Sequence, residues 1–375
     1  MRIVHISDIH LSESNFDVFE TDYIKALLKT LKEEHDQDPI DIIAITGDLV
    51  DQGGHSLFKI EKFKGKTDPY EIFEDEFITP IKNHLKLNNA NFLFIPGNHD
   101  IDENEIKWVD EKKLKKIEAD GDINSILKDI RLDSHEKFSY RIKQFKDFEK
   151  RFHKESIGTT YQFTRNQSTY IYEVNKDIKV GFALINDSWR CSTCELQAYF
   201  GNGLYFGYKQ LNDALNLLAG TTMNIVMTHH PIESYAEKED IQAILTHKDY
   251  HLHLFGDKHH HQLRRLISSS GGCFGIMARS ALNKPKEPES KWQPGFHIIT
   301  INFQEACLEE ILYYKYLPFQ FCFTNDGEIA PKDGRDVSKH PLGFTPFITE
   351  VNNSETSEDG NLEDQIMENY IKDVK

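Results

Sequence analysis

The sequence predicts a layered α/β domain, on three observations. Short apolar runs alternate with segments of helical period, each run ends in a polar loop often marked by glycine, and polar side chains cluster directly after the runs. The predicted strands are residues 2–6, 41–46, 91–96, 223–228 and 251–255. The predicted helices are residues 22–34, 71–87, 208–218 and 240–247. Such alternation is typical of sheets covered by helices.

The regions outside these elements differ in pattern. Residues 101–160 are rich in charge and helical in period, which predicts a helical cap inserted into the domain. The cap either shapes the substrate site or only packs on the domain, and the sequence leaves both open. From residue 318 to 375 the pattern loosens into an irregular acidic tail. Residues 361–374 regain a weak helical pattern, which predicts a terminal helix able to dock on this chain or on a protein partner.

Composition limits the classes of partner. The chain has 375 residues, and 44 Lys and Arg against 61 Asp and Glu give a formal charge of -17. A charge of this sign repels nucleic acid and anionic membranes, unless a local basic groove exists. No run reaches the roughly 18 apolar residues of a membrane helix, and Met1 leads directly into a strand rather than a signal peptide. We therefore expect a cytoplasmic protein without a membrane partner.

Metal-type ligands follow the first three predicted strands. Asp8 and His10 follow strand one, and their i, i+2 spacing in extended backbone places both side chains on one side. Asp48 follows a glycine after strand two, and its two carboxylate oxygens can bridge two ions. Asn98 and His99 follow strand three, as a hard oxygen ligand and a candidate proton donor. Each motif alone also fits a surface coincidence or a turn.

Two further motifs end later strands. His229 lies in Thr-His-His-Pro after the fourth strand, and Asp257 and His259 lie in Gly-Asp-Lys-His after the fifth. Loops after the carboxyl ends of strands in an open α/β sheet converge on one crevice, so these five motifs can share one site. His251 and His253 belong to the strand itself.

In this order, the motifs D-x-H, GDxxDxG, GNHD, HHP and a glycine-led final motif resemble the calcineurin-like metallophosphoesterase superfamily. The resemblance covers about residues 1–317, the predicted main domain, and includes FGIMARSAL and PGFHIITI, which look like the family's closing strands. It implies a β-sandwich flanked by helices with two divalent metal ions. Mn²⁺ is the first expectation, with Mg²⁺, iron and Zn²⁺ as alternatives.

The resemblance also implies the ligand sets. The first ion would be held by Asp8, His10, Asp48 and His259. The second would be held by Asp48, Asn98, His229 and the residue after the glycine of the final motif. Family members usually have G-H-x-H there, whereas this chain has Asp257. Either Asp257 ligates and favours a harder ion, or His259 and His261 form the pair, or the second ion is held weakly.

The same resemblance implies a mechanism. Two ions about 3.5 to 4 Å apart would activate a water that attacks phosphorus in line. His99 would protonate the leaving alkoxide. In the phosphoprotein phosphatase branch the second aspartate of GDxxD orients this histidine, which nominates Asp51. Gln52 stands where that branch has a phosphate-binding arginine, which counts against a protein phosphatase.

These observations predict a hydrolase of phosphoric esters, and first a phosphodiesterase or nuclease acting on a nucleotide or nucleic acid. One alternative is a phosphomonoesterase for small molecules or phosphoproteins. Another is a binding or scaffold protein of the same fold, weakened in catalysis by Asp257. Four basic residues lie near the final motif, and they either steer an anionic substrate or pair with surface carboxylates. They are Lys258, Arg264, Arg265 and Arg279.

Overall fold

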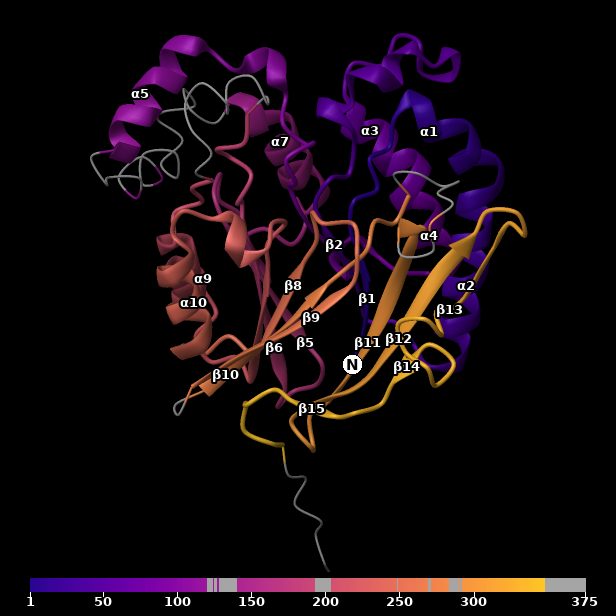
Figure 1. Ribbon diagram of the computed structural model, residues 1–375, viewed down its shortest axis with the longest axis vertical. Coiled ribbons are helices and arrows are strands. Elements are labelled where there is room, and N and C mark those ends of the chain that lie inside the picture. The colour runs from indigo at the N-terminus through magenta and orange to yellow at the C-terminus, as the bar shows by residue number, and fades with distance from the viewer. Residues whose placement is uncertain are drawn as a thin grey trace, which may run out of the picture.

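The computed structural model describes residues 1–347 apart from 120–123, 125–126, 128–139, 193–203, 248, 269–270, 283–288 and 290–291. Two β-sheets face each other, and helices cover their outer faces (Figure 1). This is the β-sandwich flanked by helices that the resemblance implied.

The first sheet is built around three parallel strands. These are β1 (Arg2–Ile6), β2 (Ile42–Thr46) and β3 (Phe92–Ile95), and β1 also pairs in antiparallel register with β11 (Gly295–Asn302). On the other side of β11 lies β12 (Cys307–Leu317). Three short strands pair along the outer edge of β12, namely β13 (Cys322–Asn325), β14 (Arg335–Asp336) and β15 (His340–Pro341).

The second sheet has the order β4-β5-β6-β7-β8-β10-β9. Its strands are β4 (Tyr161–Gln162), β5 (Ser168–Glu173), β6 (Lys179–Leu184), β7 (Met223–Met227), β8 (Leu252–Phe255), β9 (Gln262–Ser268) and β10 (Gly271–Met277). The central strands β6, β7, β8 and β10 are parallel. The carboxyl ends of each parallel set therefore lie at one edge of their sheet.

Helices cover the two outer faces. The first sheet is covered by α1 (Glu13–Val18), α2 (Ile24–Gln37), α3 (Pro69–Phe73), α4 (Thr79–Leu85) and α7 (Lys143–Phe152), whose apolar side chains share one core with it. The second sheet is covered by α9 (Lys209–Leu217) and α10 (Lys238–His247). The helices α2, α9 and α10 agree with predicted helices to within three residues, whereas the one helix predicted at 71–87 falls on α3, a π-helical turn and α4.

The strands are apolar throughout because both of their faces are buried. In β1, Ile3 faces the second sheet and Val4 faces the helices, and in β2, Ala44 and Ile43 divide in the same way. Side chains of a strand alternate between its faces, so a strand covered on both sides has no polar alternation. This is why the sequence shows short continuous apolar runs.

The predicted cap region contains two described helices, α5 (Trp108–Ala119) and α7. In Figure 1, α5 lies at the top of the molecule, whereas the N-terminus and the start of β1 lie toward the bottom. Buried ion pairs tie α5 to the rest, since Glu111 contacts both Arg141 and Arg190. Part of the region, including residues 128–139, lies outside the described residues, and a substrate-shaping role stays a prediction.

The irregular tail predicted from residue 318 differs from the structure, because β13, β14 and β15 pair with β12 between residues 322 and 341. Strands of two to four residues separated by turns are too short to show a periodic pattern. Their stabilisation comes from the long edge of β12, whose backbone groups need partners. The predicted terminal helix at 361–374 lies outside the described residues. Within the described part of the chain, no helix is long and apolar enough to span a membrane.

Candidate metal centre

Five of the candidate ligands have a left-handed backbone. The φ angles are 54° at Asp8, 50° at His10, 55° at Asp48, 72° at Asp257 and 55° at His259. Residues with a Cβ atom avoid this region, at a cost of order 1–3 kcal/mol each, and such strain concentrates at functional sites. All five lie in loops that directly follow β1, β2 and β8. Five of the eleven non-glycine residues with positive φ in the described part of the chain are thus nominated ligands.

The first group of ligand atoms comes from β1 and β8. His259 Nε2 lies 3.2 Å from Asp8 Oδ1 and 3.3 Å from His10 Nε2. His10 Nε2 lies 3.4 Å from Asp48 Oδ2. Three nitrogen and oxygen donors from two loops therefore converge around one point, with Asp48 beside them.

The second group shares Asp48. His229 Nε2 lies 3.3 Å from Asp48 Oδ2 and 3.1 Å from Asn98 Oδ1. The other ring nitrogen of His229, Nδ1, lies 2.7 Å from the carbonyl oxygen of Thr46, which can only accept a hydrogen bond. Nδ1 is therefore the donor, and Nε2 is left as the atom that can ligate.

The donor atoms fit divalent cations. Asp8 Oδ1 is buried and accepts no hydrogen bond from any residue in the described part of the chain, although an imidazole nitrogen lies 3.2 Å away. Asp8 and Asp48 are both almost fully buried. Burial raises the pKa of Asp48, but His229 and His10 hold it well below its usual range, so the carboxylate stays charged. Buried carboxylates facing imidazoles suit Mn²⁺, iron or Zn²⁺.

Asp257 lies on the side of the second group. Its carboxylate is close to His229 and His230, with ligand atoms within 4.8 Å of one another, and its backbone N–H donates to Asp8 Oδ2 at 3.3 Å. The His261 side chain does not join this group, because its Nδ1 lies 3.1 Å from the Met277 carbonyl oxygen. The structure therefore brings Asp257, rather than His261, to the donors of the second group.

His99 and Asp51 form a dyad beside the first group. His99 Nδ1 lies 2.6 Å from Asp51 Oδ1, and the His99 ring contacts the His10 ring edge-on at 4.5 Å. Burial lowers the pKa of His99, but the hydrogen bond to Asp51 and the charge of Asp48 raise it to about 9. His99 is therefore an imidazolium at neutral pH in the metal-free chain and can act as an acid.

The model of the calcineurin-like phosphoesterase family matches residues 1–261. The chain belongs to this family. Its members are hydrolases of phosphoester bonds, and the family implies two divalent metal ions.

One curated relative of this calcineurin-like phosphoesterase is the "Uncharacterized metallophosphoesterase-like protein YydB" of Bacillus subtilis (strain 168), which is 22% identical over 352 residues. The match covers 92% of the chain but only 64% of the relative's length. A dimetal phosphatase from Danio rerio matches at 12% identity and a TM-score of 0.44, covering 84% of this chain and 95% of that one. The NAD nucleotidase of Haemophilus influenzae matches at 10% identity and a TM-score of 0.39, covering 87% and 48%.

Two buried carboxylates of this phosphoesterase were not singled out by the motifs. Asp100 accepts hydrogen bonds from the backbone N–H groups of Leu49, Val50 and Gly97, and so ties the loop of Asp48 to that of His99. Burial and the charge of Asp48 raise the pKa of Asp100 to about 7, against these backbone hydrogen bonds.

The other carboxylate, Asp187, holds the loop of His229. Its Oδ2 accepts from the backbone N–H groups of His229 at 3.0 Å and His230 at 2.8 Å. It also contacts His230 Nδ1 at 3.0 Å and the Tyr235 hydroxyl at 2.5 Å. Asp187 follows β6 by three residues, so the strand-end rule that found the other motifs could have found it.

The basic residues nominated for substrate steering are mostly paired. Lys258 contacts Asp257 at 2.5 Å, Arg279 contacts Asp326 at 2.9 Å, and Arg264 contacts Glu233. Their charges are locally balanced, so these contacts favour the alternative in which such residues serve as ion-pair partners.

Proposed function

We propose that the phosphoesterase cleaves phosphodiesters with two divalent ions, first Mn²⁺. The proposed ligands of the first ion are Asp8, His10, Asp48 and His259. The proposed ligands of the second are Asp48, Asn98, His229 and Asp257. The convergence of these side chains from both sheets supports the assignment. The cytoplasmic location stays a prediction.

Each group has a separate chemical task. Two divalent ions in these positions would supply Lewis acidity to the phosphoryl oxygens and lower the pKa of the attacking water. Asp48 lies between the two donor groups and fixes their separation. His229 and Asn98 are held in place by Thr46 and by each other.

His99 is the proposed proton donor to the leaving oxygen. Asp51 engages Nδ1 at 2.6 Å, which leaves Nε2 as the atom that donates. Asp51 thus fixes the ring and stabilises its charged form. A positioned acid of this kind contributes typically about 10²- to 10⁴-fold to the rate.

The balance of charge carries the preference for a diester. Asp8, Asp48, Asp51 and Asp257 all lie at the centre, and Lys258, the nominated cation closest in sequence to the ligands, is paired with Asp257. A phosphomonoester has a second pKa of about 6 and carries close to two negative charges at pH 7, whereas a diester carries one. These four carboxylates offset the four positive charges of two divalent ions, so the charge of His99 is the main one left to attract a phosphate, which favours the less charged ester.

A nucleotide is a better-supported substrate than a polynucleotide. Three of the four nominated basic residues are paired with carboxylates, so the chain offers little support for a continuous basic groove. A polynucleotide substrate would make the rate fall steeply with salt, because phosphate contacts release counterions. We expect cleavage of a dinucleotide to depend only weakly on salt between 50 and 300 mM.

The test compares hydrolysis of bis-para-nitrophenyl phosphate with that of the mono-para-nitrophenyl ester in the presence of Mn²⁺. We expect metal-dependent cleavage that favours the diester and is abolished by Asp48→Ala. A preference for the monoester would reject the diesterase and leave a phosphomonoesterase.

The departure at Asp257 favours one second candidate, a binding protein that has lost efficient turnover. Asp257→His separates the two candidates. Absence of turnover by the natural chain, with recovery in Asp257→His, would establish the binding protein and reject the enzyme.

A further inference from the structure

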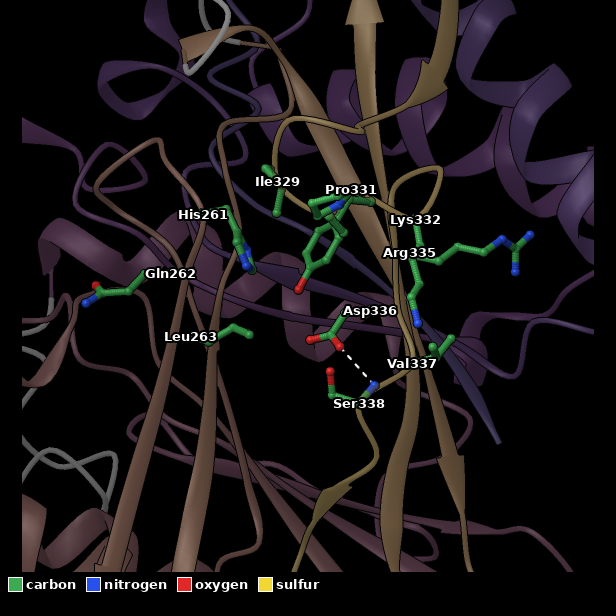
Figure 2. A pocket seen from close by; sticks show the side chains of 12 residues that line it. His261, Gln262, Leu263, Ile329, Pro331, Lys332, Arg335, Asp336, Val337 and Ser338 are labelled. Atoms are coloured by element: carbon green, nitrogen blue, oxygen red, sulfur yellow. Dashed lines mark hydrogen bonds between the residues drawn. The ribbon is translucent and has the colours of Figure 1, made fainter.

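A cavity lies between β9, at the edge of the second sheet, and the residues that pair along β12 of the first sheet. Its volume is about 630 Å³. One wall is the start of β9, and the other is formed by residues 329–338 around β14, with Tyr313 of β12 also in the lining. Figure 2 shows His261 and Leu263 on one side and Val337 on the other. Pockets for organic ligands have typical volumes of about 300 to 1,000 Å³.

The lining combines apolar side chains with polar and charged ones. Leu263, Ile329 and Pro331 line the cavity (Figure 2). The His261 ring meets the Tyr313 ring edge-on, with centroids 4.4 Å apart. Arg335 pairs with Glu310 at 2.7 Å, and Asp336 accepts from the Ser338 N–H at 2.9 Å.

The Tyr313 hydroxyl is the unsatisfied polar group of this cavity. Tyr313 is 3% exposed, and its hydroxyl has no hydrogen-bond partner in the described part of the chain. Its backbone is fixed, since its N–H donates to the Gly334 carbonyl at 2.8 Å. Burial and the nearby charge of Asp336 raise the pKa of this hydroxyl, so it remains a donor. A buried donor without a partner is costly, and a ligand acceptor would remove that cost.

A cation stands at the rim. Lys332 lines the cavity and is exposed, and it forms no ion pair with any residue that the structure describes. The cavity therefore combines one pair of aromatic rings, one buried hydrogen-bond donor and an exposed lysine without an ion-pair partner among the described residues. A flat heteroaromatic ring with an anionic substituent matches all three features.

We propose that this cavity is a nucleotide-binding site distinct from the metal centre, in which the base lies against Tyr313 and His261 and the phosphate meets Lys332. The Tyr313 hydroxyl donates to a ring nitrogen or carbonyl of the base. His261 follows the proposed ligand His259 by two residues, so a nucleotide bound against His261 contacts the loop that carries His259. The site does not depend on the proposed diesterase activity.

The test measures nucleotide binding in a variant whose metal centre is disabled, so that nucleotides cannot bind at that centre instead. Calorimetric titrations of the Asp48→Ala chain in EDTA use AMP, GMP, CMP and UMP as ligands. We expect at least one to bind with one nucleotide per chain. In this background Ile329→Trp, which fills the cavity, weakens binding more than tenfold, and Tyr313→Phe weakens it about fivefold through loss of one hydrogen bond.

Two further variants make the result specific. Lys332→Gln weakens binding of the nucleotide but not of its uncharged nucleoside. Ile267 lies on β9, the strand that forms one wall, and its side chain is 68% exposed. As the control, Ile267→Ala leaves binding unchanged. Absence of binding for all four nucleotides in a folded Asp48→Ala chain rejects the site. Binding that is unaffected by both Tyr313→Phe and Lys332→Gln also rejects it, even if Ile329→Trp fails to fold.

Discussion

Two histidines of the metal centre differ from two buried histidines of the interior in the direction in which their pKa values shift. At the centre, carboxylates outweigh burial, and they raise the pKa of His99 to about 9 and that of His229 well above its ordinary value. Inside the molecule, burial dominates and lowers the pKa of His5 and His153 to about 3. Burial lowers the pKa of all four, and facing carboxylates reverse the shift at His99 and His229. At His10, burial outweighs the charges of Asp48 and Asp8, so its pKa is lowered.

The largest expected effect comes from removing the shared carboxylate. Asp48→Ala deletes the side chain that lies between both donor groups, within 3.4 Å of His10 Nε2 and 3.3 Å of His229 Nε2. We expect diester hydrolysis with Mn²⁺ to fall by about 10⁴-fold, since metal ions supply several kcal/mol of charge stabilisation. Bound metal, measured by elemental analysis, should fall in parallel. Full activity with unchanged metal content would remove Asp48 from the centre.

The second effect concerns the proton donor. His99→Ala should lower the rate by about 10³-fold for a diester with an alkyl leaving group, which needs protonation. The loss should be much smaller for para-nitrophenol, a leaving group that departs as an anion. Metal content serves as the control, because His99 is not a proposed ligand. Equal losses for both leaving groups would contradict an acid role.

The third effect concerns Asp187, which holds the loop of the proposed ligand His229 but is not itself a proposed ligand. Asp187→Ala removes the acceptor of the His229 and His230 backbone N–H groups. Loss of such support typically lowers metal affinity by about 10- to 100-fold. Mn²⁺ titration should show this weaker affinity, and saturating Mn²⁺ should restore most of the activity. Loss of activity that excess Mn²⁺ does not restore would speak against a positioning role.

The smallest effect is expected in the interior, at His153. Both ring nitrogens lack partners in the described part of the chain, and the ring stacks on Tyr161 at 4.1 Å. The folded pKa of about 3 lies below the ordinary value of 6.5, so below pH 6.5 the unfolded chain binds a proton that the folded chain refuses. Stability is therefore lost as the pH falls from 6.5 toward 3.

His153→Phe keeps the stacking and removes this titration. Between pH 7.5 and pH 5.5, the variant should lose about 1.4 kcal/mol less stability than the natural chain, as measured by urea unfolding. Activity with Mn²⁺ at pH 7.5 should not change, in contrast to His99→Ala. An unchanged pH dependence of stability would show that His153 is not neutral and buried in solution.

The sequence by itself determined the family, the main strands and the nominated ligands, because these residues sit in short motifs at the ends of apolar runs. Strand ends converge by rule, so Asp8 and His259 can be associated across about 250 positions without coordinates. The tertiary structure decided those contacts that leave no pattern in the local sequence. It placed Asp257 beside His229 while turning His261 away, and it brought Asp187 to the His229 loop. It also paired residues 322–341 with β12, because strands of two to four residues are stabilised only by the edge on which they lie.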